Sequence, residues 1–96
     1  MWFATDQLDN TPHGYPRMTR YKNLSGDSGV TAYEIGSDFI NVQFSNGAVY
    51  EYNHAVTGSR HVEQMKQLAE QGQGLSSFIA SKVHGAYARK VHEPGE

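Results

Sequence analysis

The sequence predicts a small α+β domain, in which a three-stranded antiparallel β-meander is followed by two α-helices packed on one face of the sheet. Two patterns predict this fold. Apolar and polar residues alternate in three short runs, and apolar residues recur at helical spacing in two later stretches. The chain has 96 residues, a length that corresponds to one domain with one core.

Residues 1–17 show neither period and are rich in turn-forming residues. We expect an irregular N-terminal arm here, in which Trp2, Phe3 and Tyr15 are candidates for packing back onto the domain. The single domain is then expected over residues 18–91, and residues 92–96 are expected to form a frayed tail.

Three strands are expected between residues 31 and 52, since period-2 alternation is typical of half-buried antiparallel strands. The residues expected to face the helices are Thr31, Tyr33, Ile35, Ile40, Val42, Phe44, Ala48, Tyr50 and Tyr52. The opposite, open face is expected to hold Glu34, Phe39, Asn41, Gln43, Ser45 and Glu51.

The turn at Asn46-Gly47 allows two registers for the second hairpin. A two-residue loop would turn both tyrosines of the third strand toward the polar face. A three-residue loop over 45–47, with Gly47 in the left-handed region, keeps all apolar residues on one face. Because register follows the buried pattern, we prefer the longer loop. It pairs Phe44 with Ala48, Val42 with Tyr50 and Ile40 with Tyr52.

Two helices are expected after residue 57. Thr57 or Ser59 is the predicted cap of the first, and Gly72 and Gly74 mark its end. Gly85 is mildly unfavourable inside the second. The apolar stripe that faces the core consists of Val62, Met65, Leu68 and Ala69 in the first helix, and of Leu75, Phe78, Ile79, Val83, Ala86 and Tyr87 in the second.

The composition limits the possible chemistry. The chain has no cysteine, which excludes disulfides, thiolate metal sites and a cysteine nucleophile, and which fits a cytoplasmic location. It has no apolar run long enough to span a membrane, and its N-terminus lacks the pattern of a secretory signal. The five histidines have no metal-binding spacing, and no catalytic motif is found. We therefore expect no enzyme, no cofactor, no metal and no membrane contact.

Basic residues gather on the two flanks of an acidic middle. Residues 10–22 and 71–92 contain no acidic residue. Lys82 and Arg89 are seven positions apart, so on a continuous second helix they would share one side. The candidate RNA- or partner-binding residues are Arg17, Arg20, Lys22, Lys82, Arg89 and Lys90. The alternative is an ordinary solvated helix face, which the sequence pI of about 6.2 favours.

The tyrosines admit two interpretations. Tyr33, Tyr50, Tyr52 and Tyr87 either line a ligand pocket between sheet and helices or belong to the core with their hydroxyls at its rim. The open sheet face carries two carboxylates, which would repel a phosphate backbone. Base stacking on that face, as in RRM domains, is therefore not expected.

Four stretches, 20–30, 46–52, 63–69 and 74–79, together resemble the KTSC domain. This small module is named from the C-terminus of some lysyl-tRNA synthetases and also occurs as short bacterial and phage-type proteins. The resemblance covers roughly residues 18–90. It implies the meander-plus-helices fold and, by association only, RNA binding. The chain departs from the family where Val56 is followed by Thr57 rather than proline, and in the arm over 1–17, which has no recognised counterpart.

Two function hypotheses remain open. The first is a non-enzymatic module that contacts RNA or a ribonucleoprotein through the basic helix edge and the arm. The second is a protein-interaction adaptor or phage-type inhibitor that docks on a host protein, for which the polar sheet face and the aromatic arm are the supporting features.

Overall fold

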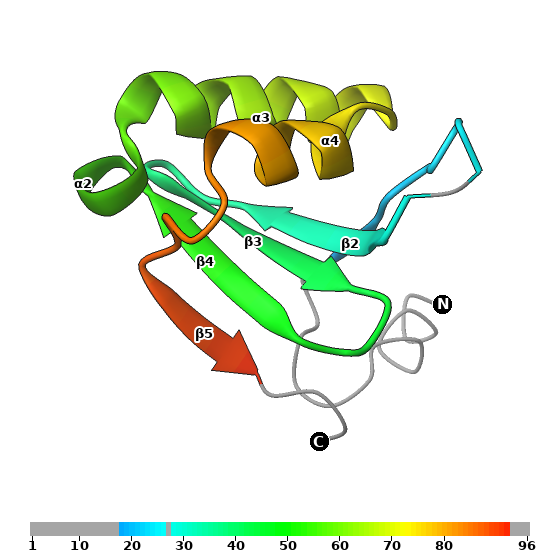
Figure 1. Cartoon of the computed structure of the whole chain (residues 1–96), viewed down its shortest axis with the longest axis horizontal. Coiled ribbons are helices and arrows are strands. Elements are labelled where there is room, and N and C mark those ends of the chain that lie inside the picture. The colour runs from blue at the N-terminus through cyan, green and yellow to red at the C-terminus, as the bar shows by residue number, and fades with distance from the viewer. Residues whose placement is uncertain (1–17, 27, 93–96) are drawn as a thin grey trace, which may run out of the picture.

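The computed structural model describes residues 18–26 and 28–92 as an antiparallel sheet covered by helices (Figure 1). The sheet order is β1-β2-β3-β4-β5. Its strands are Thr19–Arg20 (β1), Val30–Ile35 (β2), Phe39–Phe44 (β3), Val49–Asn53 (β4) and Arg89–His92 (β5), and the helices are His54–Thr57 (α2), Ser59–Gln71 (α3) and Leu75–Lys82 (α4). The α+β class is confirmed. The predicted numbers of elements were wrong, because the described residues form five strands and three helices rather than three and two.

The central meander has the predicted register. Val42 pairs with Tyr50 and Ile40 with Tyr52, and the Phe44 amide donates to the Ala48 carbonyl over 2.9 Å. Gly47 has φ 95°, so the three-residue loop with a left-handed glycine is confirmed. Both tyrosines of β4 consequently lie on the same face as the apolar residues of β3.

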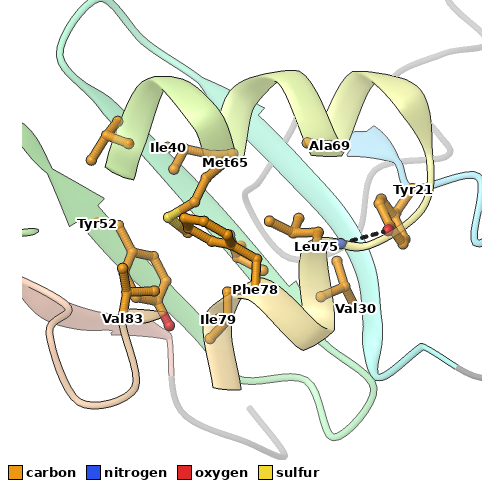
Figure 2. Packing of buried hydrophobic residues seen from close by; sticks show 12 residues of the cluster. Tyr21, Val30, Ile40, Tyr52, Met65, Ala69, Leu75, Phe78, Ile79 and Val83 are labelled. Carbon is orange, nitrogen blue, oxygen red and sulfur yellow. Dashed lines mark hydrogen bonds between the residues drawn. The ribbon is translucent and has the colours of Figure 1, made fainter. Parts of the chain in front are cut away.

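α3 and α4 lie on that face and enclose the core (Figure 2). Met65 and Leu75 are fully buried, and Phe78 packs beside them against the sheet. Tyr21, which follows β1, closes one end of this cluster. Its hydroxyl accepts a hydrogen bond from the backbone N–H of Leu75 at 3.2 Å, across 54 residues of sequence.

The second helix is shorter than its apolar spacing predicted. α4 ends at Lys82, and Gly85 adopts φ 80°, a left-handed conformation in which a helix cannot continue. After this turn the chain runs along β4 as β5, where Tyr50 pairs with Lys90 and Glu51 with Arg89. The prediction that 83–87 is helical was therefore wrong, and His92 belongs to a strand rather than to a tail.

The predicted cap of the first long helix was also wrong. A separate turn of helix, α2, precedes it and is capped by the Asn53 side chain, which accepts from the Val56 amide. α3 then begins after Gly58 with no side-chain cap. Thr57 instead lies in α2, and its hydroxyl donates to the Ala86 carbonyl at 2.7 Å. Among the described residues, no helix is long and apolar enough to cross a membrane.

Candidate functional site

A groove of about 620 Å³ lies between α4 and the β3–β4 hairpin. We call it the tyrosine groove and define it by the side chains of Phe44, Tyr50, Tyr52, Ile79, His84 and Tyr87. Its other lining residues are glycine, serine, asparagine and alanine, so none of its lining residues carries a carboxylate. The groove is therefore aromatic, with small polar groups around the rings.

The four rings of the groove form one connected series. Tyr50 is central, because its ring centroid lies 5.7 Å from that of Phe44 and 4.6 Å from that of Tyr87, both in edge-to-face geometry. Tyr87 also meets Tyr52 edge-to-face at 6.4 Å. Tyr52 is buried at the floor, whereas Tyr87 is 39% exposed. The groove thus presents accessible ring surface on a buried aromatic base.

The segment after α4 holds Tyr87 in place. The Thr57 hydroxyl binds the Ala86 carbonyl on one side of Tyr87. On the other side, the Ala88 amide donates to the Glu51 carbonyl at 2.7 Å. These two anchors fix a turn that has no regular secondary structure, so the exposed ring has a defined position.

A cation lies beside the rings. The Lys90 ammonium stands 5.5 Å from the centroid of the Tyr50 ring, within cation–π range. Burial, with smaller contributions from neighbouring Tyr50 and Tyr87, raises the pKa of Tyr52 to about 12. The Tyr52 hydroxyl is therefore neutral at physiological pH, and Lys90 supplies positive charge at the edge of the groove.

The predicted basic residues do not gather on one helix edge. Arg17 lies outside the described residues. Arg20 is exposed on β1, opposite Ala32 at the far side of the sheet from β5. Lys22 is also exposed, and its stem packs against Gly72 at the end of α3.

Arg89 and Lys90 lie on β5 rather than on the second helix, so the predicted alignment of Lys82 with Arg89 was wrong. Being adjacent on a strand, Arg89 and Lys90 point to opposite faces. The Arg89 Nε binds the Glu51 Oε1 at 3.0 Å, while Lys90 faces Tyr50. Lys82 is exposed at the end of α4 and is not part of the groove lining. Lys90 is also absent from the lining, but its ammonium lies 5.5 Å from the ring of Tyr50, which lines the groove, so among the described candidates it stands at the groove edge.

The pocket interpretation of the tyrosines is supported for three of the four. Tyr50, Tyr52 and Tyr87 line the groove, whereas Tyr33 lies elsewhere against the core. The sequence reasoning missed His84 and Phe44 as lining residues. His84 follows α4, which ends at Lys82, so the helical period of the sequence does not place it.

The opposite face of the sheet is less open than expected. Asn41 is 8% exposed, and its Nδ2 donates to the Glu34 Oε1 at 3.2 Å. The Glu51 carboxylate binds Arg89 and accepts from the Asn53 amide group. Both carboxylates of this face are therefore engaged within the sheet.

Neither a metal-binding group among the described residues nor a known relative identifies what the groove binds. Within 18–26 and 28–92, no group of three or more histidine, cysteine or acidic residues could hold a metal ion. Comparisons with protein-family models, with curated proteins and with solved structures found no match. The resemblance to the KTSC domain therefore stays a prediction.

Proposed function

We propose that this chain is a non-enzymatic binding module that holds single-stranded RNA in the tyrosine groove. Bases stack on Tyr50 and Tyr87, and the Lys90 ammonium faces a phosphate. The observation that carries the proposal is a connected aromatic surface with a cation beside it and no carboxylate in its lining. Sequence-tolerant binding of single strands uses this combination of stacking and positive charge.

The charges around the groove favour an anionic ligand. Arg89 points to the other face and binds Glu51 there, so this carboxylate does not face the groove. The KTSC resemblance is a second support, because it implies an association with a tRNA synthetase. The basic surface in this proposal is the groove side of β5, in place of the continuous helix edge expected from the sequence.

The test is binding of a short fluorescein-labelled oligouridine, measured by anisotropy at low and at physiological salt. Tyr87→Ala removes an exposed ring and should weaken binding roughly 5- to 150-fold, which corresponds to about 1–3 kcal/mol for one stacked base. Tyr87→Phe keeps the ring and should bind as the parent chain does. This pair separates stacking from any role of the hydroxyl.

Two matched lysine variants test where the phosphate of the RNA lies. Lys90→Gln and Lys22→Gln each remove one positive charge, the first beside Tyr50 and the second near Gly72. Lys90→Gln should weaken binding and reduce the salt slope by about 1, while Lys22→Gln should change little. Equal effects of the two variants would mean nonspecific attraction, and no binding at low salt would exclude RNA altogether.

A second candidate is a protein-interaction adaptor. The observation in its favour is that β5 is an edge strand of the described sheet and runs beside the groove. An extended peptide of a host protein could add to this edge and place an apolar side chain among the tyrosines. This candidate is favoured if Tyr87→Ala abolishes capture of one defined protein while the parent chain fails to bind the oligouridine.

A further inference from the structure

Asn46 brings a side-chain amide of fixed orientation to one end of the tyrosine groove. It lies in the loop between β3 and β4, is exposed, and lines the groove together with Phe44. Its Oδ1 accepts from the Ala48 backbone N–H at 3.0 Å. A backbone N–H only donates, so the accepting atom is the oxygen and the other atom of the amide is Nδ2. This Nδ2 has no hydrogen-bond partner within 18–26 and 28–92.

The other polar side chains of the described lining have no fixed hydrogen-bond role. They are the hydroxyls of Ser45, Ser76, Tyr50, Tyr52 and Tyr87 and the imidazole of His84. A hydroxyl both donates and accepts, and a neutral imidazole does so through its two tautomers, so these groups adapt to either kind of ligand atom. The Asn46 Nδ2 only donates. It therefore distinguishes an acceptor on the ligand from a donor.

The strand order sets the direction in which a stacked base lies. β3 and β5 flank β4 on opposite sides (Figure 1). The Lys90 ammonium approaches the Tyr50 ring from β5, whereas Asn46 follows β3 at the tip of the hairpin. A nucleotide with its phosphate at Lys90 and its base on Tyr50 therefore directs the outer edge of the base toward the β3 side, where Asn46 lies. This outer edge is the Watson–Crick edge, which proteins read in single-stranded RNA.

We propose that the tyrosine groove selects uracil over cytosine and that Asn46 is the residue that distinguishes them. This inference rests on the proposed function, because it concerns the base that stacks on Tyr50. The two pyrimidines have rings of the same size, so stacking alone separates them little. They differ on the outer edge, where uracil has the acceptor O4 and cytosine has the donor amino group N4. The Asn46 Nδ2 donates to O4, but it meets the cytosine amino group donor to donor.

The first test compares an oligouridine with an oligocytidine of the same length and label, by fluorescence anisotropy at low salt. The parent chain should bind the oligouridine about 2- to 10-fold more tightly, which is the effect of one net hydrogen bond. Equal affinities, or tighter binding of the oligocytidine, would overturn the selection and leave RNA binding by the groove intact. Binding of neither oligonucleotide would overturn both.

Asn46→Asp exchanges the donor for an acceptor at nearly constant size. One carboxylate oxygen still accepts from the Ala48 N–H, and the other takes the place of Nδ2. The added negative charge weakens both oligonucleotides alike, so the ratio of the two affinities isolates the effect on the base. This ratio should fall to one or below.

Asn23→Asp is the matched control. The Asn23 Oδ1 accepts from the Ser28 N–H at 3.0 Å, and Asn23 is not among the described residues that line the groove. The same exchange of amide for carboxylate should therefore leave the affinity ratio at the parent value. An unchanged ratio in Asn46→Asp, or an equal shift in Asn23→Asp, would refute the role of Asn46.

The side-chain amide of Asn46 gives a second readout in the unaltered chain. In a proton–nitrogen correlation spectrum, the oligouridine should move the Nδ2 proton signals of Asn46 downfield, since this N–H group gains an acceptor. The oligocytidine should not move them downfield, and the side-chain amide signals of Asn23 should respond to neither. Downfield shifts of the same size with both oligonucleotides would contradict the proposal.

Discussion

Substituting Tyr21 by phenylalanine should destabilise the domain through one lost hydrogen bond. α4 starts after Gly74 and has no side-chain cap of its own. The Tyr21 hydroxyl accepts from the Leu75 N–H at 3.2 Å, and both residues are buried (Figure 2). Tyr21→Phe keeps the ring and its packing, so the change isolates the hydroxyl.

The expected cost is that of leaving a buried amide without an acceptor, about 1–3 kcal/mol. In a domain of this size, each kcal/mol lowers Tm by about 4–8 °C. Urea unfolding should therefore show a lower midpoint with an unchanged slope. Amide exchange at Leu75 should also accelerate, because its N–H loses its partner.

Tyr87→Phe is the matched control. It removes a hydroxyl from a ring that is 39% exposed, so the free energy of unfolding should change by less than about 0.5 kcal/mol. If Tyr21→Phe unfolds at the same urea concentration as the parent chain, or if Leu75 exchange is unaffected, the hydroxyl does not cap α4 and the reasoning fails.

Three further outcomes are expected. Gly72→Ala should lower the free energy of unfolding in urea by at least about 1–2 kcal/mol, because Gly72 has φ 84° and a Cβ there would lie 2.6 Å from that of Lys22. Gly29→Ala is the control and should be close to neutral, since a Cβ at Gly29 would have no atom within 4 Å. Met65→Ala should cost about 2–5 kcal/mol, since the side chain is fully buried, and a loss below 1 kcal/mol would mean that the core collapses around the gap. The pKa of Tyr52 is raised to about 12 in the folded chain. The stabilisation that the neutral Tyr52 hydroxyl gives to the fold is therefore complete below pH 10 and is lost as the pH rises from 10 through 12, by roughly 3 kcal/mol. Tyr52→Phe should flatten this part of the stability profile measured in urea.

The meander could be predicted because its information is local. Alternation assigned the faces of β3, β4 and most of β2, and the need to keep Tyr50 and Tyr52 with Val42 selected the loop that ends at Gly47. At the start of β2 the prediction was wrong, because a register shift between Val30 and Ala32 places Val30 in the core and leaves Thr31 exposed. The apolar stripes of α3 and of α4 up to Ile79 are equally local.

The edge strands could not be predicted in the same way. β1 has two residues, too few to show a period. The segment that ends in β5 has Val83, Ala86 and Tyr87 at helical spacing, and only the left-handed Gly85 and the hydrogen bonds of Ala86 and Ala88 divert it to the edge of β4. Because β5 is a strand and not part of the second helix, Arg89 and Lys90 lie on opposite faces of the sheet instead of along one helix edge. The candidate site in the structure therefore differs from the predicted one.

The sequence by itself determined the α+β class, the register of the meander and the face on which Tyr50 and Tyr52 lie, because periodicity and turn chemistry act over a few residues. Only the tertiary structure decided that Tyr87 completes a groove with them and that Lys90 stands beside it. Those contacts join residues from a turn and two strands. Packing and hydrogen bonds between distant segments bring them together, and no local period encodes them.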